Sequence, residues 1–453
     1  MPLAIRGGFT SVSRTLFVGL AALSLAAALI HDDRAIGRFA REPAILSLLG
    51  LAGLTLVSAA WTSGEAADAV RWGLVIAAYG ATALVAALVA REQGVMAIAV
   101  LIAVIAVIEA AIGLVAAGLR LEPFAERIGG SWRPGGTLEY PPALALLLVG
   151  ALPILLRAMF AARLTLGLAG AAGAALAAGA IGLADSRTET ALALGVLAVA
   201  VIWPATVRAP RSRLALAGVI LVAAALGMRL ALGGYAFPGE IGSDAGRLFA
   251  LVAVVAGATL AWVAARWSWH RSPSVARREP GGLQRTTALT LVAVLAVAGL
   301  IGLVAAQRSG GPWTEPASGF THGRADQWQA AIDTALDHPV GGVGADAYLR
   351  ASAAEQGNQV SRYAHDLPLE AWAELGPLGL ALVLALGSFV ALVLWRIRRD
   401  PDAWLVAPAA AAFLLANLVD WPWHLAGAGA VWAAALGACI ATLRGPAPRR
   451  ALI

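Results

Sequence analysis

The chain has 453 residues, of which 60% are hydrophobic and only 13% are charged. A soluble domain of this length does not need so large an apolar fraction for its core, so the composition excludes a soluble globular protein and predicts an integral membrane protein. The net charge is +6, and all 33 basic residues are arginines that gather in a few short loops. This clustering indicates membrane topology rather than a nucleic-acid-binding face.

The two ends of the chain carry few other signals. Arg6 and Arg14 precede the first apolar run, and no clear small-residue cleavage site follows it, so we interpret this run as a membrane segment rather than a signal peptide. The single cysteine, Cys439, lies in the last apolar segment. One cysteine supports neither a disulfide framework nor a cysteine metal site.

Apolar stretches of about 20 residues predict membrane-crossing helices. The candidate segments are 15–31, 44–60, 69–90, 95–118, 142–160, 163–184, 188–204, 213–234, 246–265, 286–306, 370–395, 402–419 and 425–443. The first two are short and weakly apolar. The sequence therefore predicts an all-α polytopic membrane protein, a bundle of about 12 transmembrane helices.

The distribution of arginines predicts the orientation, because short cytoplasmic loops are rich in basic residues. The loop 266–285, the loop after Pro204 and the two basic stretches 395–400 and 444–450 share one parity, which places the C-terminus in the cytoplasm. The side of the N-terminus depends on whether both of the first two segments span.

The same parity places a long polar stretch outside the cytoplasm. It carries seven acids against four arginines. We therefore divide the chain into N-terminal transmembrane helices (1–306), a large extracytoplasmic loop (307–366) and C-terminal transmembrane helices (367–453).

Inside this loop a short helix is predicted in the stretch that starts at Arg324, and Pro339 is expected to end it. Trp328, Ile332 and Leu336 recur at intervals of four, and aspartates occupy the other faces, which is typical of a helix lying at the membrane surface. Pro339 ends the pattern, and a glycine-rich turn follows it.

The loop and the helix after it carry a recognisable order of residues. An arginine is followed by a tryptophan, then by "HPVGGVGADAY", and some 20 residues later "AHDLPLEAWAELGPLG" enters an apolar helix. This order resembles the signature of the superfamily of O-antigen ligases and Wzy-type O-antigen polymerases. The matching residues are Arg324, Trp328, Pro339, Gly342, Gly344, Tyr348, His365, Leu369, Glu374, Gly376 and Gly379.

Two upstream stretches are similar to further elements of the same superfamily. They are "RPGGTLEYPPALALLL" at 133–148 and "DSRTETALAL" at 185–194. The chain departs from the pattern at Asp366 and Pro142, where the superfamily has asparagines.

The resemblance implies an O-antigen ligase-like glycosyltransferase at the outer, periplasmic face of the bacterial inner membrane. Such an enzyme moves a glycan from an undecaprenyl diphosphate carrier to an acceptor, such as lipid A-core or another hydroxyl, without a metal or a cofactor. Its partners would be the donor, an acceptor glycolipid or glycan and membrane lipids, and not nucleic acid. A Wzy-type polymerase, which uses a second lipid-linked glycan as acceptor, is an alternative. A solute transporter is a second alternative, because carriers also contain about 12 helices.

His365 is the candidate catalytic residue. Asp366 is a good N-cap and Pro368 suits a first helical turn, so the imidazole is predicted at the N-terminus of a helix. The helix dipole disfavours an imidazolium there. A neutral histidine could accept a proton from an acceptor hydroxyl.

Arginines are the candidate ligands of the donor diphosphate, because the guanidinium fork donates two hydrogen bonds to phosphate oxygens. Arg324 in the large loop and Arg187 in a very short outer turn are the best placed. Arg247 at a helix start and Arg133 in an outer loop are weaker candidates, expected chiefly as lipid-facing anchors.

Two glutamates follow the histidine on one helix face. Glu370 lies in the first turn, where a carboxylate ordinarily stabilises the helix dipole. Glu374 lies deeper, so we expect it to pair with an arginine or with the histidine. The tryptophans of "DWPWH" at 420–424 are predicted to form an aromatic belt at the outer boundary.

Overall fold

The computed structural model describes residues 10–128, 130–203, 205, 207–232, 244–271, 324–357 and 360–444. Within these residues, ten helices are long and apolar enough to cross a membrane. This confirms an all-α polytopic membrane protein. The predicted span 286–306 and most of the loop 266–285 lie outside the described residues.

The helices belong to two compact units, each described here by itself. Unit 1 comprises Met1–Ala99 and Glu315–Ile453. Its α-helices are α1 (Ser11–Ala40), α2 (Pro43–Val57), α3 (Ala66–Gln93), α12 (Arg324–Asp337), α13 (Tyr348–Ser352), α14 (Leu367–Ile397), α15 (Ala407–Ala416) and α16 (Ala426–Leu443). Its 3₁₀ helices are η3 (Ser58–Ala60), η7 (Ala403–Leu405) and η8 (Pro422–His424).

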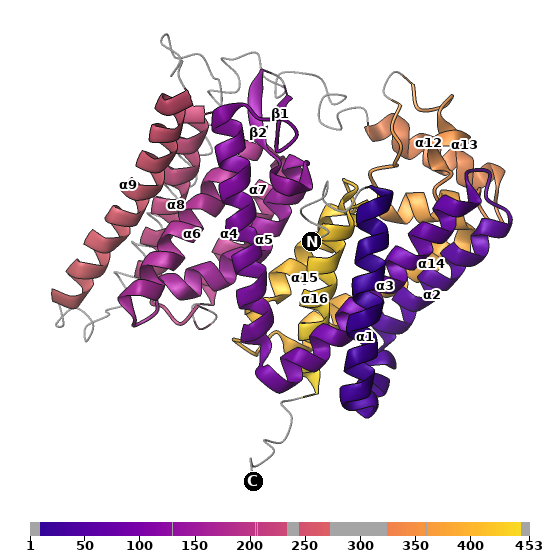
Figure 1. The fold of residues 1–453 in the computed structure, drawn as a ribbon, viewed down its shortest axis with the longest axis horizontal. Helices are drawn as coiled ribbons and strands as arrows, with labels where there is room; N and C mark the ends of the chain where they lie inside the picture. Colours follow the sequence, from indigo (N-terminus) through magenta and orange to yellow (C-terminus); the bar gives the residue numbers. More distant parts are fainter. Residues whose placement is uncertain are drawn as a thin grey trace. The chain divides into compact units, whose positions relative to one another are not determined.

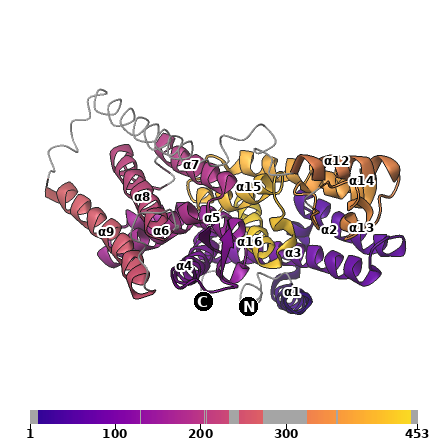
Figure 2. The same ribbon diagram turned by 90° about the horizontal axis from the view of Figure 1, so that it is seen from above.

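Helix α3 is central in unit 1 and packs against α1, α2 and α16. Small residues allow the closest approaches, since a Cβ on Gly437 of α16 would collide with the backbone of Ala83 in α3. Helix α14 packs against α2 and α12, and Figure 2 shows α12 and α13 beside the N-terminal part of α14. The segment that carries the family-like signature therefore lies against one end of α14.

Unit 2 comprises Val100–Thr314. Its elements are most of α4 (Val95–Leu119), β1 (Ala125–Ile128), β2 (Ser131–Pro134), η4 (Gly136–Leu138), α5 (Pro141–Met159), α6 (Leu164–Ala184), α7 (Arg187–Ile202), α8 (Arg211–Leu232) and α9 (Asp244–Arg271). The strands form an antiparallel hairpin in which Ala125 pairs with Pro134 and Ile128 with Ser131. Helix α6 packs against α5, α8 and α9 (Figure 1).

Three predicted spans differ from the observed helices. The segment 402–419 contains η7 and the 10-residue α15, and α15 rises only about 15 Å, half of the hydrocarbon thickness, so a continuous spanning helix there is wrong. A proline in its first turn and Asn417 at its C-cap limit this helix. The segment 188–204 forms α7 of 16 residues. Conversely, the first segment is not short, because α1 has 30 residues with one non-helical position at Asp32.

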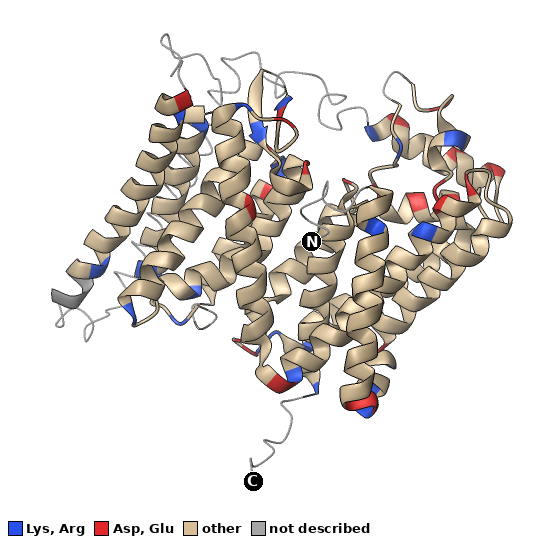
Figure 3. Cartoon of the chain, viewed as in Figure 1, with Lys and Arg blue, Asp and Glu red and all other residues tan. Residues whose placement is uncertain are grey.

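Charged residues lie mostly toward the helix ends and in the connections, and the middle of most helices is apolar (Figure 3). A charge in the hydrocarbon core is costly, so this distribution fits helices that cross a bilayer.

Candidate functional site

The chain enters α14 through a capped turn, as predicted. The carboxylate of Asp366 accepts a hydrogen bond of 2.8 Å from the backbone N–H of Leu369, and Pro368 lies in the first turn. His365 precedes the cap with a φ of +56°, in the left-handed region that few non-glycine residues adopt. This backbone conformation places His365 at the N-terminus of α14.

The hydrogen bond of His365 to the backbone defines its tautomer. Its Nδ1 lies 3.1 Å from the carbonyl oxygen of Tyr363. A carbonyl can only accept, so Nδ1 carries the proton and Nε2 bears the lone pair. Burial lowers the pKa of His365 below its usual value, and the charge of Arg324 acts in the same direction, against the opposing effect of Asp420. His365 is therefore neutral at pH 7, with Nε2 available to accept a proton.

Arg324 is the first residue of α12, and α12 ends at Asp337, two residues before the predicted stop at Pro339. The packed face of this helix differs from the predicted apolar stripe. Its buried residues are Gln327, Ala330, Ala331, Thr334 and Ala335. Leu336 of the stripe is 61% exposed, because small side chains, rather than bulky ones, let α12 approach α14 closely.

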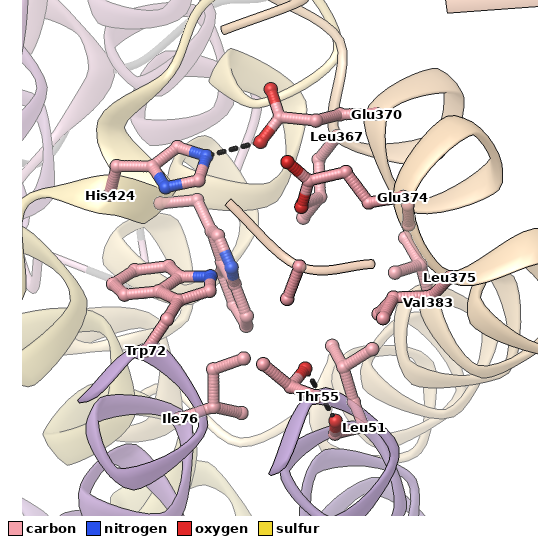
Figure 4. A pocket seen from close by; sticks show the side chains of 13 residues that line it. Leu51, Thr55, Trp72, Ile76, Leu367, Glu370, Glu374, Leu375, Val383 and His424 are labelled. Carbon is pink, nitrogen blue, oxygen red and sulfur yellow. Dashed lines mark hydrogen bonds and ion pairs between the residues drawn. The ribbon is translucent and has the colours of Figure 1, made fainter. Parts of the chain in front are cut away.

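Glu370 is buried and makes two hydrogen bonds. One oxygen lies 2.5 Å from Nε2 of His424 in η8, as Figure 4 shows. The other accepts the backbone N–H of Ala364 at 2.9 Å. Since Ala364 directly precedes His365, the carboxylate of Glu370 connects the segment of the histidine to η8. Its role thus exceeds the dipole stabilisation expected of a first-turn carboxylate.

His424 is held between two aromatic rings. Its ring stacks on Tyr363 at 3.8 Å and on Trp72 at 4.7 Å between centroids. Burial lowers the pKa of His424 well below its usual value, and the positive charge of Arg14 adds to this effect. His424 is therefore neutral, and its Nε2 shares a hydrogen bond with the carboxyl group of Glu370.

The predicted aromatic belt at 420–424 is wrong for Trp423, which is only 2% exposed. Its carbonyl accepts the hydroxyl of Tyr79 at 2.9 Å, and its ring packs edge-on against Tyr79 and Trp432. The segment turns inward because the side chain of Asn417 accepts the backbone N–H of Trp423 at 2.8 Å.

Among the residues that the structure describes, Glu374 bonds to backbone N–H groups rather than, as expected, to an arginine or a histidine. One carboxylate oxygen accepts the N–H groups of Ala347 and Tyr348 at 3.0 and 3.1 Å. The carbonyl of Glu374 accepts the N–H of Gly344 at 2.7 Å. Glu374 therefore fastens the glycine-rich turn to α14.

A cavity of about 20 Å³ lies beside the two glutamates (Figure 4). It is lined by Thr55, Trp72, Glu370, Glu374 and His424 among others. This volume accommodates about one water molecule. A sugar or a phosphate does not fit there, so a substrate would reach His365 from outside this core.

The other candidate arginines lie in unit 2. Arg133 forms an ion pair of 3.0 Å with Asp185, which also pairs with Arg229 at 2.7 Å. Arg187 begins α7 directly after this aspartate and the N-cap Ser186, so the predicted short turn is present.

Arg247 is buried rather than lipid-facing, with an exposed fraction of 6%. Its Nε donates to the carbonyl of Gly118 at 2.5 Å, and its guanidinium pairs with Asp244. These contacts join the start of α9 to the end of α4.

A family model described as O-Antigen ligase matches residues 242–384. The matched region contains Arg247, Arg324, His365, Glu370 and Glu374. This match supports the resemblance of the chain to the O-antigen ligase superfamily. No curated protein matches the chain. At a coarse level the match supports an enzyme of the ligase or polymerase type, a class that in general uses a lipid-linked glycan and an acceptor.

Four residues around the signature of this O-antigen ligase-like protein were missed by sequence reasoning: Arg14, Trp72, Asp420 and His424. Arg14 donates to the carbonyl of His424 at 3.4 Å and lies over the ring of Trp72 at 5.1 Å. Titratable residues within apolar stretches are a functional signal in membrane proteins, and Asp420 and His424 carry it.

Proposed function

We propose that this protein transfers a glycan from an undecaprenyl diphosphate carrier to a hydroxyl of an acceptor, such as lipid A-core, at the periplasmic face of the bacterial inner membrane. The observation that carries the proposal is the neutral His365, whose Nε2 lone pair stands at the N-terminus of α14 with Arg324 nearby. The O-antigen ligase domain supports the reaction class. The arginine-rich loops support the orientation.

In the proposed step, Nε2 of His365 takes the proton of the acceptor hydroxyl while the hydroxyl oxygen attacks the anomeric carbon of the glycan. The bond between this carbon and the diphosphate oxygen breaks. Undecaprenyl diphosphate leaves with the electron pair, and the acceptor keeps the glycan. His365 later returns the proton to water or to the leaving group.

Cations would stabilise the charge that develops on the leaving diphosphate. We assign this role first to Arg324, whose positive charge acts on His365. Arg187, and more weakly Arg247 and Arg133, all in unit 2, are proposed as diphosphate ligands on the resemblance alone, separately from the geometry around His365. The ion pairs of Arg133 and Arg247 with aspartates would then orient these guanidinium groups.

Glu370 and Glu374 have supporting roles in this proposal. Glu370 holds the backbone before His365, and Glu374 holds the turn that connects α12 to α13. Neither carboxylate needs to touch the substrate. Their hydrogen bonds position the backbone segments that carry His365 and follow Arg324, and so help to orient both side chains toward the substrate.

The proposal is tested in cells that lack the protein and carry the parent, Arg324→Ala or, as a matched control, Arg350→Ala, whose side chain is exposed. Glycans are separated on gels, and their molecular masses are measured by mass spectrometry. We expect the parent and the control to attach the glycan to its acceptor, and Arg324→Ala to leave it on the lipid carrier. Loss of long chains with single repeats still attached would indicate a polymerase. Full activity of Arg324→Ala would contradict the assignment, and loss of a transported solute with unchanged glycans would favour a carrier.

A further inference from the structure

Several large apolar side chains are exposed where α2 ends and the turn after α12 begins. Val340 is 87% exposed, Leu336 61%, Leu378 57% and Trp61 40%. Apolar side chains gathered in this way mark a surface that contacts lipid or another protein.

A hydrogen bond and close packing hold Trp61 and the turn at 340–341 at the level of Gly376 in unit 1. The indole N–H of Trp61 donates to the carbonyl of Gly341 at 3.0 Å. The carbonyl of Val340 lies against Gly376 of α14, where a Cβ would come within 2.5 Å of its oxygen. Leu378 follows on the same helix after Gly376 and Pro377.

Helix α14 changes direction at this level. Gly376 has a φ of +70°, and Pro377 follows it, so the helix is kinked there. From Gly376 to Trp395 the helix rises about 28 Å, close to the hydrocarbon thickness of about 30 Å. Trp395 is 62% exposed and the guanidinium of Arg398 lies 3.6 Å from its ring centre, a pairing typical of a membrane interface.

Helix α2 gives the same boundary independently. It packs against α14, with Gly50 of α2 in contact with Leu382 of α14. From Pro43 to Trp61 the chain rises about 27 Å. Two neighbouring helices therefore each have an apolar stretch about as long as the hydrocarbon core is thick. Both stretches end at the level where Trp61 contacts the turn at 340–341.

We propose that Trp61, Leu336, Val340 and Leu378 form a lipid-binding surface that is embedded in the headgroup layer, and that the hydrocarbon boundary crosses α14 at Gly376. The partner is the phospholipid leaflet on the side of the large loop. The first turns of α14, with Glu370 and Glu374, then lie above the hydrocarbon. This inference stands without the proposed function.

Three single-cysteine variants test the depth of this surface in lipid vesicles, in a Cys439→Ala background that removes the only native thiol. Val340→Cys reports the depth of the proposed lipid-binding surface. Glu355→Cys, at an exposed position in the loop, is the aqueous control. Leu384→Cys, which is 53% exposed about 12 Å below Gly376, is the hydrocarbon control. Each carries an environment-sensitive fluorophore, and iodide, headgroup nitroxide lipids and mid-chain nitroxide lipids serve as quenchers.

We expect the fluorophore at 340 to be quenched most by headgroup nitroxides and at least threefold less by iodide than the fluorophore at 355. Mid-chain nitroxides should quench 384 most. Iodide quenching at 340 equal to that at 355 would overturn the proposal, as would a preference for mid-chain nitroxides. Shielding of position 340 from both iodide and lipid nitroxides would show a protein partner instead, and would also overturn it.

Discussion

Glu370 and His424 form a 2.5 Å hydrogen bond between two side chains that are almost fully buried. The second oxygen of the same carboxylate accepts the N–H of Ala364, the residue before His365. One buried carboxylate thereby links three segments: the start of α14, the turn that carries His365, and η8. The position of the candidate base depends on this link.

Replacing Glu370 should lower the stability of the folded protein. Glu370→Ala leaves the N–H of Ala364 and Nε2 of His424 without their hydrogen-bond partner, which should lower the free energy of unfolding by about 2–5 kcal/mol. Glu370→Gln keeps an acceptor oxygen and should lose less. Thermal unfolding of the purified protein measures both. Glu355→Ala, at an exposed position, is the control, and equal midpoints for Glu370→Ala and this control would contradict the role of the link.

The transfer rate should depend on the protonation of His365. The neutral form is the active one, and burial lowers its pKa, so activity should persist until the pH falls below the ordinary histidine value of about 6.5. Asp420 raises this pKa, and Asp420→Asn should therefore move the acid limb of the rate profile to lower pH. Initial rates between pH 4.5 and 8 measure the shift. Asp333→Asn is the control, and a shift to higher pH would refute the assignment of the base.

The glycine-rich turn should not tolerate side chains. Gly344 has a φ of +87°, and a Cβ there would collide with Thr62. Gly344→Ala should thus cost about 1–3 kcal/mol or more. Gly387→Ala in α14 is the matched control, because nothing lies within 4 Å of its added methyl group, and it should be neutral or stabilising by up to about 1 kcal/mol. Equal unfolding midpoints for the two variants would show that the turn adapts.

Substitutions of two arginines in unit 2 should differ in their effects on stability and on the transfer rate. Arg247 is buried and donates to the carbonyl of Gly118, so Arg247→Ala should lower the unfolding midpoint as well as the transfer rate. Arg187→Ala should lower the transfer rate at least tenfold with a smaller effect on the midpoint, since Arg187 begins a helix at a turn. Rate and unfolding measurements on the same preparations test this. Unchanged transfer by Arg187→Ala would remove it from the proposed donor site.

The helix ends of the signature could be predicted because their causes are local. Asp366 caps α14, and α12 ends just before Pro339, the predicted stop. Such signals extend over only a few residues. The ligase superfamily could also be recognised from the sequence, because its signature residues lie within one stretch of the chain.

The interior of the site could not be predicted, because its contacts join distant segments. Nothing local distinguishes the buried Trp423 and His424 from an interfacial belt of the same composition. The packed face of α12 was missed for a related reason. Alanines give a weak apolar signal, although they allow the closest contact with α14.

The central claim is that His365 accepts the proton of the acceptor hydroxyl, and His365→Ala tests it most directly. His338→Ala is the matched control, because His338 is an exposed histidine between α12 and α13. Both variants are expressed at equal membrane levels in cells that lack the parent, and the fraction of glycan on the acceptor and on the lipid diphosphate is measured. We predict that His338→Ala attaches the glycan as the parent does, whereas His365→Ala leaves it on the carrier with at least a hundredfold lower rate. Attachment by His365→Ala at the rate of the parent would contradict the account.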